Sequence, residues 1–353
     1  ETASGQDPKI DFSNDARRTS VVDVNLDGLV DVVVTTGTEV QTFFSLGRYP
    51  GAAPGGPSGA GRFGSGAWTS ASTAALSEEP VRACLPWSGT AIQLGDADVF
   101  LGDLNGDGLV DLARVRSGDV RYWPGRGNGF WGTGRRDDCP AGTFADGRHL
   151  AMTASPTFGA VQGEGRLLLD DVNGDGLADL VEVRFDEVDV YLNVDGVGWT
   201  PRHVLGGVPP LAPSGRRARL VDADGSGTRD VLWGNGWDYR YVDLQGGKRP
   251  WLLASVSNGL GKRTTLEYAT TTELMLRAER ADGAGCTAAE QETQPFACPW
   301  QHRMPVVTHV VTRRTETTGL PVAGTTPVVV TEYEYRDPVY EGRERSFRGF
   351  ERS

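Results

Sequence analysis

Short apolar runs separated by polar, glycine-containing turns recur through the N-terminal part of the chain. The runs are rich in Val, Leu and aromatic residues, which is typical of buried β-strands. The pattern predicts strands at residues 32–35, 112–115, 180–183 and 231–233. After the last three, a short turn is followed by a second expected strand, at residues 120–123, 188–192 and 239–242.

The C-terminal part of the chain has a different period. Strands are expected at residues 263–268, 306–312 and 328–335, and the last two, joined by a Gly- and Thr-rich connection, are expected to pair antiparallel. We therefore predict an all-β protein with two regions, 1–250 and 251–353, and a boundary near 245–260. Residues 47–75, rich in Gly, Ala, Pro and Ser, are expected to form a flexible insert.

Composition agrees with a β-rich fold and narrows the choice of partners. Of 353 residues, 48 are Gly and 20 are Pro, which disfavours a helical bundle. The formal charge of −12 argues against nucleic acid or an anionic membrane as the main partner, and no apolar run reaches the roughly 18 residues of a membrane span. The first residue is Glu1 rather than Met, so we expect a processed product or a fragment.

One nine-residue pattern occurs four times, with oxygen donors at positions 1, 3, 5 and 9 and a backbone carbonyl available at position 7. Ca²⁺ takes about six to eight oxygen ligands, and a loop with a donor at every second residue can surround it. A solvated acidic turn is the alternative for one copy, but four copies in register favour metal binding. The predicted ligands are Asp23, Asn25, Asp27, Leu29 and Asp31; Asp103, Asn105, Asp107, Leu109 and Asp111; Asp171, Asn173, Asp175, Leu177 and Asp179; and Asp222, Asp224, Ser226, Thr228 and Asp230.

The loops differ from EF-hands. An EF-hand has a bidentate Glu at position 12 and helices on both sides, whereas position 12 here is Val34, Arg114, Glu182 or Trp233 and strands flank the loops. The first aspartates are 80, 68 and 51 residues apart, close to the length of a four-stranded propeller blade. We therefore expect about four structural Ca²⁺ ions in propeller blades.

The same loops account for the acidity of the chain. They carry 12 of the 47 acidic residues, three in each loop, so the remaining 35 acids balance the 35 basic residues. The negative charge is thus concentrated in four predicted cation sites.

The D-x-N-x-D-G-x-x-D loops resemble FG-GAP or VCBS repeats, which form the blades of integrin-type propellers. Residues 115–130 and the C-terminal stretch 332–350, with Tyr335-Arg-Asp-Pro and Phe347-Arg-Gly-Phe, resemble the middle region of the B subunit of bacterial insecticidal toxin complexes, related to SpvB and Rhs proteins. The resemblance covers nearly all of residues 15–353 apart from the inserts.

This resemblance implies a secreted, non-enzymatic virulence protein. Its propeller would dock a channel-forming A-type subunit, and its β-shell, with a C-type subunit, would enclose a toxic segment. It further implies that residues 251–353 are shell wall. The main alternative is an integrin-like, calcium-dependent adhesion module that binds a surface protein or a glycan.

The usual marks of catalysis are missing from the sequence. None of His149, His203, His302 and His309 lies in H-E-x-x-H, and there is no G-x-S-x-G elbow. Two G-x-G-x-x-G matches begin at Gly59 and Gly127. With 48 Gly among 353 residues about one match is expected by chance, and neither opens a helical pattern, so both are rejected as nucleotide sites. A propeller lyase or glycosidase would need a His/Tyr/Arg or carboxylate cluster; Asp96 with Asp98 and Asp170 with Asp171 are carboxylate pairs, interpreted here as acids near a metal.

Two structural features complete the picture. The aromatic residues are expected to pack mainly between blades: Tyr122, Trp123, Trp131, Trp199, Trp233, Trp237 and Trp251. The cysteines show no zinc-site spacing, and a disulfide between Cys286 and Cys298 is the best pairing, with free thiols as the alternative; the states of Cys84 and Cys139 stay open.

Overall fold

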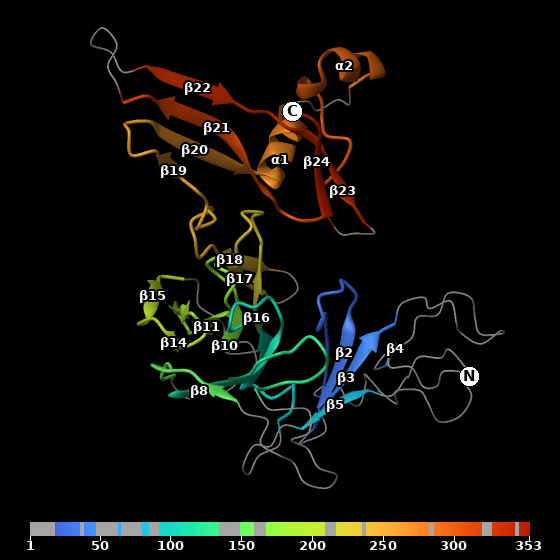
Figure 1. Ribbon diagram of the computed structural model, residues 1–353, viewed down its shortest axis with the longest axis vertical. Coiled ribbons are helices and arrows are strands. Elements are labelled where there is room, and N and C mark those ends of the chain that lie inside the picture. The colour runs from blue at the N-terminus through green and yellow to red at the C-terminus, as the bar shows by residue number, and fades with distance from the viewer. Residues whose placement is uncertain are drawn as a thin grey trace, which may run out of the picture. The chain divides into compact units, whose positions relative to one another are not determined.

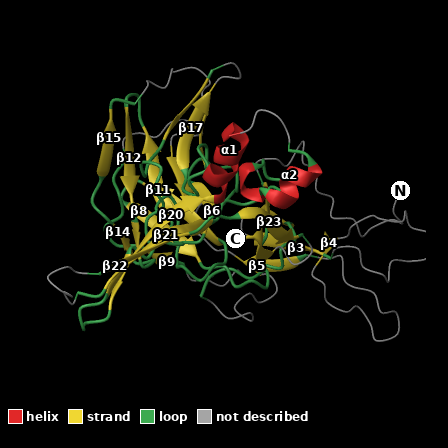
Figure 2. Ribbon diagram, turned by 90° about the horizontal axis from the view of Figure 1, so that it is seen from above, coloured by secondary structure: helices red, strands yellow, loops and turns green. Residues whose placement is uncertain are grey.

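The computed structural model describes residues 18–35, 39–46, 63–64, 80–84, 92–133, 149–158, 167–208, 217–234, 238–281, 286–319, 327–342 and 346–353. These residues form antiparallel β-sheets and a few short helices, so the all-β prediction is confirmed (Figures 1 and 2). Apart from residues 63–64, the predicted insert at 47–75 lies outside the described residues. Among the described residues, no helix is long and apolar enough to cross a membrane.

The chain divides into two compact units. The first consists of Glu1–Asp171, Gly176–Arg219 and Trp233–Tyr239, and the second of Val172–Asp175, Leu220–Leu232 and Arg240–Ser353. The fourth acidic loop therefore belongs to the same unit as the C-terminal strands. The boundary predicted near 245–260 stays a prediction.

Each of the four repeats builds one antiparallel sheet whose first two strands are joined by the acidic loop. The first sheet contains β1 (Thr19–Val22), β2 (Asp31–Thr35), β3 (Glu39–Ser45), β4 (Phe63–Gly64) and β5 (Val81–Cys84). The second contains β6 (Val99–Gly102), β7 (Asp111–Arg116), β8 (Asp119–Trp123) and β9 (Leu150–Ala151). The third contains β10 (Leu167–Asp170), β11 (Asp179–Val183), β12 (Glu187–Tyr191) and β15 (His203–Gly206). Between β12 and β15 in the chain, β13 (Asn193–Val194) and β14 (Gly198–Trp199) form a separate two-stranded hairpin. The fourth sheet contains β16 (Arg217–Val221), β17 (Asp230–Gly234) and β18 (Tyr239–Val242).

The order of strand, loop, strand, turn and strand is thus confirmed for the last three repeats, and the first repeat follows it too. The strand after each loop is the most buried of its sheet, and every residue of β2 and β11 is buried. Apolar side chains on both faces of such a strand pack against neighbouring elements, which explains the unbroken apolar runs in the sequence.

Neighbouring repeats in the first unit share their cores. Trp123, Trp131 and Val99 pack with residues of the first repeat, and Tyr122, Leu180 and Trp199 join the second repeat to the third. Trp233 is also buried, so most of the aromatic residues occupy the core as predicted. Trp251 is the exception, since 74% of its surface is exposed; Trp237 lies outside the described residues.

The second unit contains a separate four-stranded antiparallel sheet, with strands in the order β19 (Ser255–Ser257), β20 (Arg263–Thr270), β21 (His309–Thr317) and β22 (Val328–Glu332). The predicted antiparallel pairing of the last two strands is confirmed. The strand expected at 306–312 begins at His309, and the strand expected at 328–335 ends at Glu332. A further hairpin pairs β23 (Arg336–Glu341) with β24 (Ser346–Arg352).

Two helices and one helical turn were not predicted. They are α1 (Thr271–Ala281), α2 (Ala288–Thr293) and the 3₁₀ turn η1 (Pro295–Ala297). The hydroxyl of Thr270 accepts a hydrogen bond from the N–H of Glu273 at 3.0 Å, and Thr287 forms a capping box with Glu290. These side chains satisfy the free N–H groups at the helix starts.

The predicted disulfide is confirmed. Cys286 and Cys298 are joined by an S–S bond of 2.07 Å, and this bond closes the segment that contains α2 and η1.

Candidate metal centres

The four loops share one feature that the sheets impose. Position 9 is the first residue of the second strand of each sheet, and its aspartate is fully buried in every repeat: Asp31, Asp111, Asp179 and Asp230. A buried carboxylate needs hydrogen-bond donors or a cation to offset its desolvation. How each loop meets that need distinguishes the loops from one another.

In the second loop, every carboxylate oxygen has a hydrogen-bond donor from the loop or its surroundings. The N–H groups of Gly106 and Gly108 donate to the two oxygens of Asp103, each at 2.7 Å. The position-5 carboxylate, Asp107, accepts from the side-chain amide of Asn105 and from the N–H of Leu109.

The buried aspartate of this second loop is also doubly satisfied. Asp111 accepts the N–H of Leu104 at 2.9 Å and the N–H of Gly125 at 2.8 Å. The loop is therefore held closed by its own hydrogen bonds.

The first loop resembles the second except at positions 1 and 4. Asp31 accepts two backbone N–H groups, from Val24 and Ser45, and Asn25 is bonded to Asp27 as in the second loop. Position 4, however, is Leu26 rather than glycine, and the buried Oδ1 of Asp23 has no hydrogen-bond partner among the described residues.

The third loop repeats the side-chain pattern of the second. Asn173 donates to Asp175 at 2.9 Å, Gly176 donates to Asp171 at 2.9 Å, and Asp179 accepts the N–H of Asn193 at 2.8 Å.

The fourth loop places its three carboxylates differently. Carboxylate oxygens of Asp222, Asp224 and Asp230 lie within 4.8 Å of one another, and no other set of three acidic, His or Cys groups among the described residues is so close. Position 5 is Ser226, whose hydroxyl lies 2.9 Å from that of Thr228.

The buried Asp230 is only half satisfied. Its Oδ2 accepts the N–H of Ala223 at 2.9 Å, but its buried Oδ1 has no hydrogen-bond partner among the described residues.

Electrostatics make these buried carboxylates costly without a cation. Burial, reinforced by the carboxylates of Asp107 and Asp103, raises the pKa of Asp111 to about 7. Burial likewise raises the pKa of Asp230 to about 6, with a further contribution from nearby acids including Asp224. Burial also raises the pKa of Asp31. A divalent cation would oppose these shifts by favouring the ionised form.

The donor set therefore fits an oxygen-seeking cation, and the fit is best in the fourth loop. Three converging carboxylates, one with an unpaired and buried oxygen, suit Ca²⁺, which prefers oxygen ligands. The twenty predicted ligands in the four loops stay predictions.

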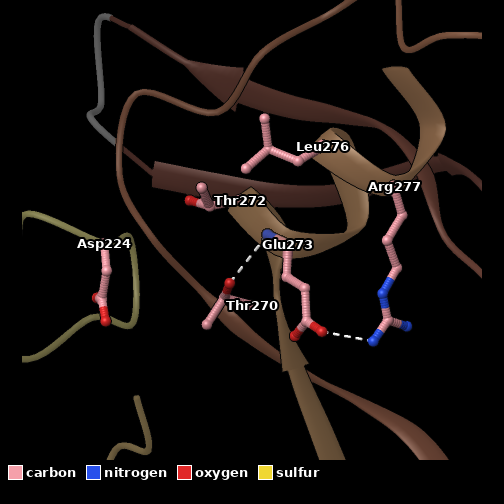
Figure 3. Close-up of a pocket in the computed structure, with 6 residues that line it drawn as sticks. All are labelled: Asp224, Thr270, Thr272, Glu273, Leu276 and Arg277. Carbon is pink, nitrogen blue, oxygen red and sulfur yellow. Dashed lines mark hydrogen bonds and ion pairs between the residues drawn. The ribbon is translucent and has the colours of Figure 1, made fainter. Parts of the chain in front are cut away.

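A pocket of about 220 Å³ lies beside the fourth loop, within the second unit (Figure 3). Asp224 faces the start of α1 across it, and Glu273, Leu276 and Arg277 come from that helix. Glu273 forms an ion pair with Arg277, so α1 contributes one negatively and one positively charged side chain to the pocket lining.

The other sequence candidates have structural partners. Asp98 accepts the Nε groups of Arg114 and Arg116 at 3.0 and 2.8 Å, and Asp170 accepts the N–H of Asp171 at 3.0 Å.

The glycine motif that begins at Gly127 and one of the four histidines, His309, can also be placed in the structure. Gly127, Gly129 and Gly132 lie in a turn after β8, all with positive φ, and no helix begins there. The glycine motif that begins at Gly59 lies largely outside the described residues. His309, the first residue of β21, lies against the fourth loop.

One cluster was not recognised from the sequence, although it lies in the Tyr335-Arg-Asp-Pro stretch. Arg336 is buried, pairs with buried Asp337 at 2.9 Å, and donates to the carbonyl groups of Cys298 and Pro299. Asp337 in turn accepts the N–H of Gln301 at 2.6 Å. The motif thus fixes the disulfide-closed segment to the start of β23.

The Phe347-Arg-Gly-Phe stretch completes this corner. The ring of Phe350 packs against the rings of Tyr335, Phe347 and Trp300, with centroids 4.9, 5.2 and 6.1 Å apart. The Tyr335-Arg-Asp-Pro and Phe347-Arg-Gly-Phe parts of the C-terminal stretch are therefore packing elements of one corner in the second unit.

Comparison with known proteins agrees with the resemblance read from the sequence. Residues 207–353 match the family described as the insecticide toxin TcdB middle/N-terminal region. The resemblance to the toxin-complex B subunit is confirmed. No curated protein matches the chain by sequence.

Solved toxin structures share the fold. The Photorhabdus luminescens Tc holotoxin pore, with the mutation TccC3-D651A, is 19% identical with a TM-score of 0.58, covering 94% of this chain and 13% of that one. The TcdB2–TccC3 crystal structure is 16% identical with a TM-score of 0.54, covering 95% of this chain and 19% of that one. The TcdB2–TccC3–Cdc42 crystal structure is 17% identical with a TM-score of 0.54, and the match covers 95% of this chain and 18% of that one. This chain therefore spans less than a fifth of each of those chains.

Proposed function

We propose that this chain is a non-enzymatic structural and binding region of a secreted bacterial toxin-complex B-type protein. The observation that carries the proposal is the match of residues 207–353 to the TcdB middle/N-terminal family, together with a fold shared with Tc toxin structures over 94% of the chain. The repeats would form blades of a propeller that docks a partner subunit, and the C-terminal sheet would contribute to a shell around a toxic segment.

In this proposal the acidic loops bind structural Ca²⁺. Support comes from the buried position-9 aspartates and from the converging carboxylates of the fourth loop. A cation that binds only the folded protein stabilises it by mass action, by about 2.7 kcal/mol at a free concentration 100 times its Kd. Loops of this extracellular kind bind at about 10⁻⁴–10⁻³ M.

Two measurements test the parts of the proposal separately. Thermal melts in millimolar CaCl₂ and in chelator should differ by several degrees and be restored by excess calcium. If chelator leaves the midpoint unchanged, the structural role of calcium is wrong, whatever the partner.

Partner binding is tested with purified channel-forming A-type and C-type toxin subunits, immobilised beside a glycan array. Binding to a toxin subunit supports the proposal. Binding to glycans or to a cell-surface protein, with none to either toxin subunit, would replace it with the adhesion alternative.

A further inference from the structure

The fourth loop has an unmet need that the second does not. Both loops contain three aspartates, and in each a backbone N–H of the loop itself donates to the buried aspartate, from Leu104 to Asp111 and from Ala223 to Asp230. Asp111 also accepts the N–H of Gly125, from the turn after β8, whereas Asp230 accepts no second donor among the described residues. The remaining Oδ1 of Asp230 is buried and unpartnered among the described residues, and an oxygen of Asp230 lies within 4.8 Å of the oxygens of Asp222 and Asp224. An unpaired charge in that position is best satisfied by a cation.

The fourth loop is also in direct contact with the C-terminal sheet of its own unit. A Cβ placed on Gly225 would lie 2.6 Å from Cγ2 of Thr272 in α1, and one placed on Gly227 would lie 2.8 Å from Cε1 of His309 in β21. Both glycines have positive φ, +76° and +81°. The loop backbone therefore contacts two elements so closely that a side chain would not fit.

Those two elements meet at one corner of the sheet. Thr270, the last residue of β20, pairs with His309, the first of β21. Next to this pair, the N–H of Thr271 donates to the carbonyl of Thr308 at 2.9 Å, and the N–H of Thr308 donates to the hydroxyl of Thr271 at 3.1 Å. Thr270 and Thr271 are both buried. The loop thus packs on an ordered corner formed by the end of β20, the start of α1 and the start of β21.

The pocket beside this contact leaves free space next to Asp224. Asp224, the exposed member of the carboxylate set, lines the pocket of about 220 Å³ on the side opposite Glu273 (Figure 3). Without a cation, the like charges of Asp222, Asp224 and Asp230 repel, and Asp224 has room to turn away from the cluster. Movement of Asp224 would carry the adjacent Gly225, on which Thr272 rests.

We infer that the fourth loop is the tightest divalent-cation site of the chain and that its occupancy by calcium orders the β20–α1–β21 corner. This inference rests on the proposed binding of calcium by the acidic loops. The inference gives the loops unequal roles. Calcium bound in the fourth loop stabilises the adjacent corner of the C-terminal sheet, whereas the second loop is closed by hydrogen bonds and depends less on metal.

The test uses the full chain, calcium chloride titrations by isothermal calorimetry, and hydrogen exchange of the amides in residues 270–276 and 307–311. The informative variant is Asp224→Asn, because Asn occupies position 3 in the other three loops and is therefore compatible with the turn. Asp186→Asn, in an exposed turn outside all four loops, makes the same change of charge and is the control.

Three results support the inference together. In the wild-type protein and in Asp186→Asn, calorimetry shows one tight calcium-binding phase, and calcium slows amide hydrogen exchange at the β20–α1–β21 corner. In Asp224→Asn, the calcium affinity of the tight phase falls about tenfold or more, and calcium no longer slows exchange at the corner. Asp107→Asn, in the second loop, changes only a weaker phase.

Other results would overturn it. Four equivalent sites, or a tight phase lost in Asp107→Asn but kept in Asp224→Asn, would refute the unequal roles while leaving calcium binding in place. Unchanged exchange at the corner would refute the coupling. No binding heat in the wild type would instead remove the calcium part of the proposed function, and with it this inference.

Discussion

The second and fourth loops have the same length, glycines at the same positions 4 and 6, and three aspartates each, yet they use those aspartates differently. In the second loop, position 5 is an acid that Asn105 and a backbone N–H hold at the surface. In the fourth, the acid is at position 3 and position 5 is Ser226, so three carboxylates converge. The number of aspartates is equal in the two loops, and their positions decide whether a buried carboxylate oxygen is left without a hydrogen-bond donor among the described residues, as Oδ1 of Asp230 is.

The largest expected difference between these loops is the cost of losing the position-9 aspartate without calcium. Asp111→Ala leaves two buried N–H donors unpaired, those of Leu104 and Gly125, which costs about 2–6 kcal/mol at about 1–3 kcal/mol each. Asp230→Ala frees one N–H, that of Ala223, whose hydrogen bond is only partly buried, so this change should cost about 1 kcal/mol.

Urea unfolding in chelator measures both variants. Equal losses would contradict the comparison. Repeating the experiment in calcium provides the control, because Asp230→Ala should then lose additional stability relative to the wild type through lost cation binding, and Asp111→Ala less so.

The next effect concerns the contacts of the fourth loop. Gly227→Ala and Gly176→Ala change the same position 6 in the fourth and third loops, at positive φ of +81° and +92°. The strain of a left-handed alanine is thus common to both. Only Gly227 lies against His309, whereas a Cβ on Gly176 meets nothing within 4 Å. Gly227→Ala should therefore lose about 1–3 kcal/mol more by overpacking.

Thermal denaturation of the two glycine variants decides this point. A smaller loss in Gly227→Ala than in Gly176→Ala would mean that His309 moves aside freely, and the close contact between loop and sheet would carry no energy. The double variant with His309→Ala serves as the control, since it should remove the excess loss.

These differences also show how far the sequence alone could lead. The apolar runs before and after each loop predicted β7, β8, β11 and β12 closely, because strands buried on both faces leave unbroken apolar patterns. The loop pattern itself identified candidate metal ligands. The number of donors reaching Asp111 and Asp230 could not be predicted, because those donors depend on the path of the chain 14 residues later, as with Gly125.

Other features were missed for different reasons. The two-residue strand β9 is too short to leave a periodic pattern. Helix α1 did leave a signal, since Thr270 and Glu273 have the spacing of a capping box ahead of good helix formers. The Arg336–Asp337 pair joins segments 38 residues apart, and no local pattern indicates such a contact.

A smaller effect tests the comparison by converting one loop toward the other. Asn105→Asp places an acid at position 3 of the second loop, as in the fourth, and removes the amide that donates to Asp107. Because calcium affinity rises with the charge of the ligand set, we expect binding about tenfold tighter, or about 1.4 kcal/mol. Calorimetry in an Asp224→Asn background removes the tight phase of the fourth loop, so a new tight phase there is due to the second loop. An unchanged titration would show that position 3 is not what separates the loops.

The smallest effect concerns an ion pair that the second repeat has near its loop. Burial favours the neutral form of Asp98, but hydrogen bonds from Arg116 and Arg114 outweigh it, so the pKa of Asp98 is lowered. A lowered folded pKa contributes stability that is present above the unfolded value of 3.8 and is lost as the pH falls through the folded value. Asp98 and Arg116 are partly exposed, which limits that pair to about 1 kcal/mol or less, although the second partner, Arg114, is buried. Asp98→Asn should therefore unfold at lower urea than the wild type at pH 6, and the gap should close at pH 3. A gap that persists or widens in acid would mean that the carboxyl contributes through its shape and neutral hydrogen bonds, rather than through the charge that Arg114 and Arg116 stabilise.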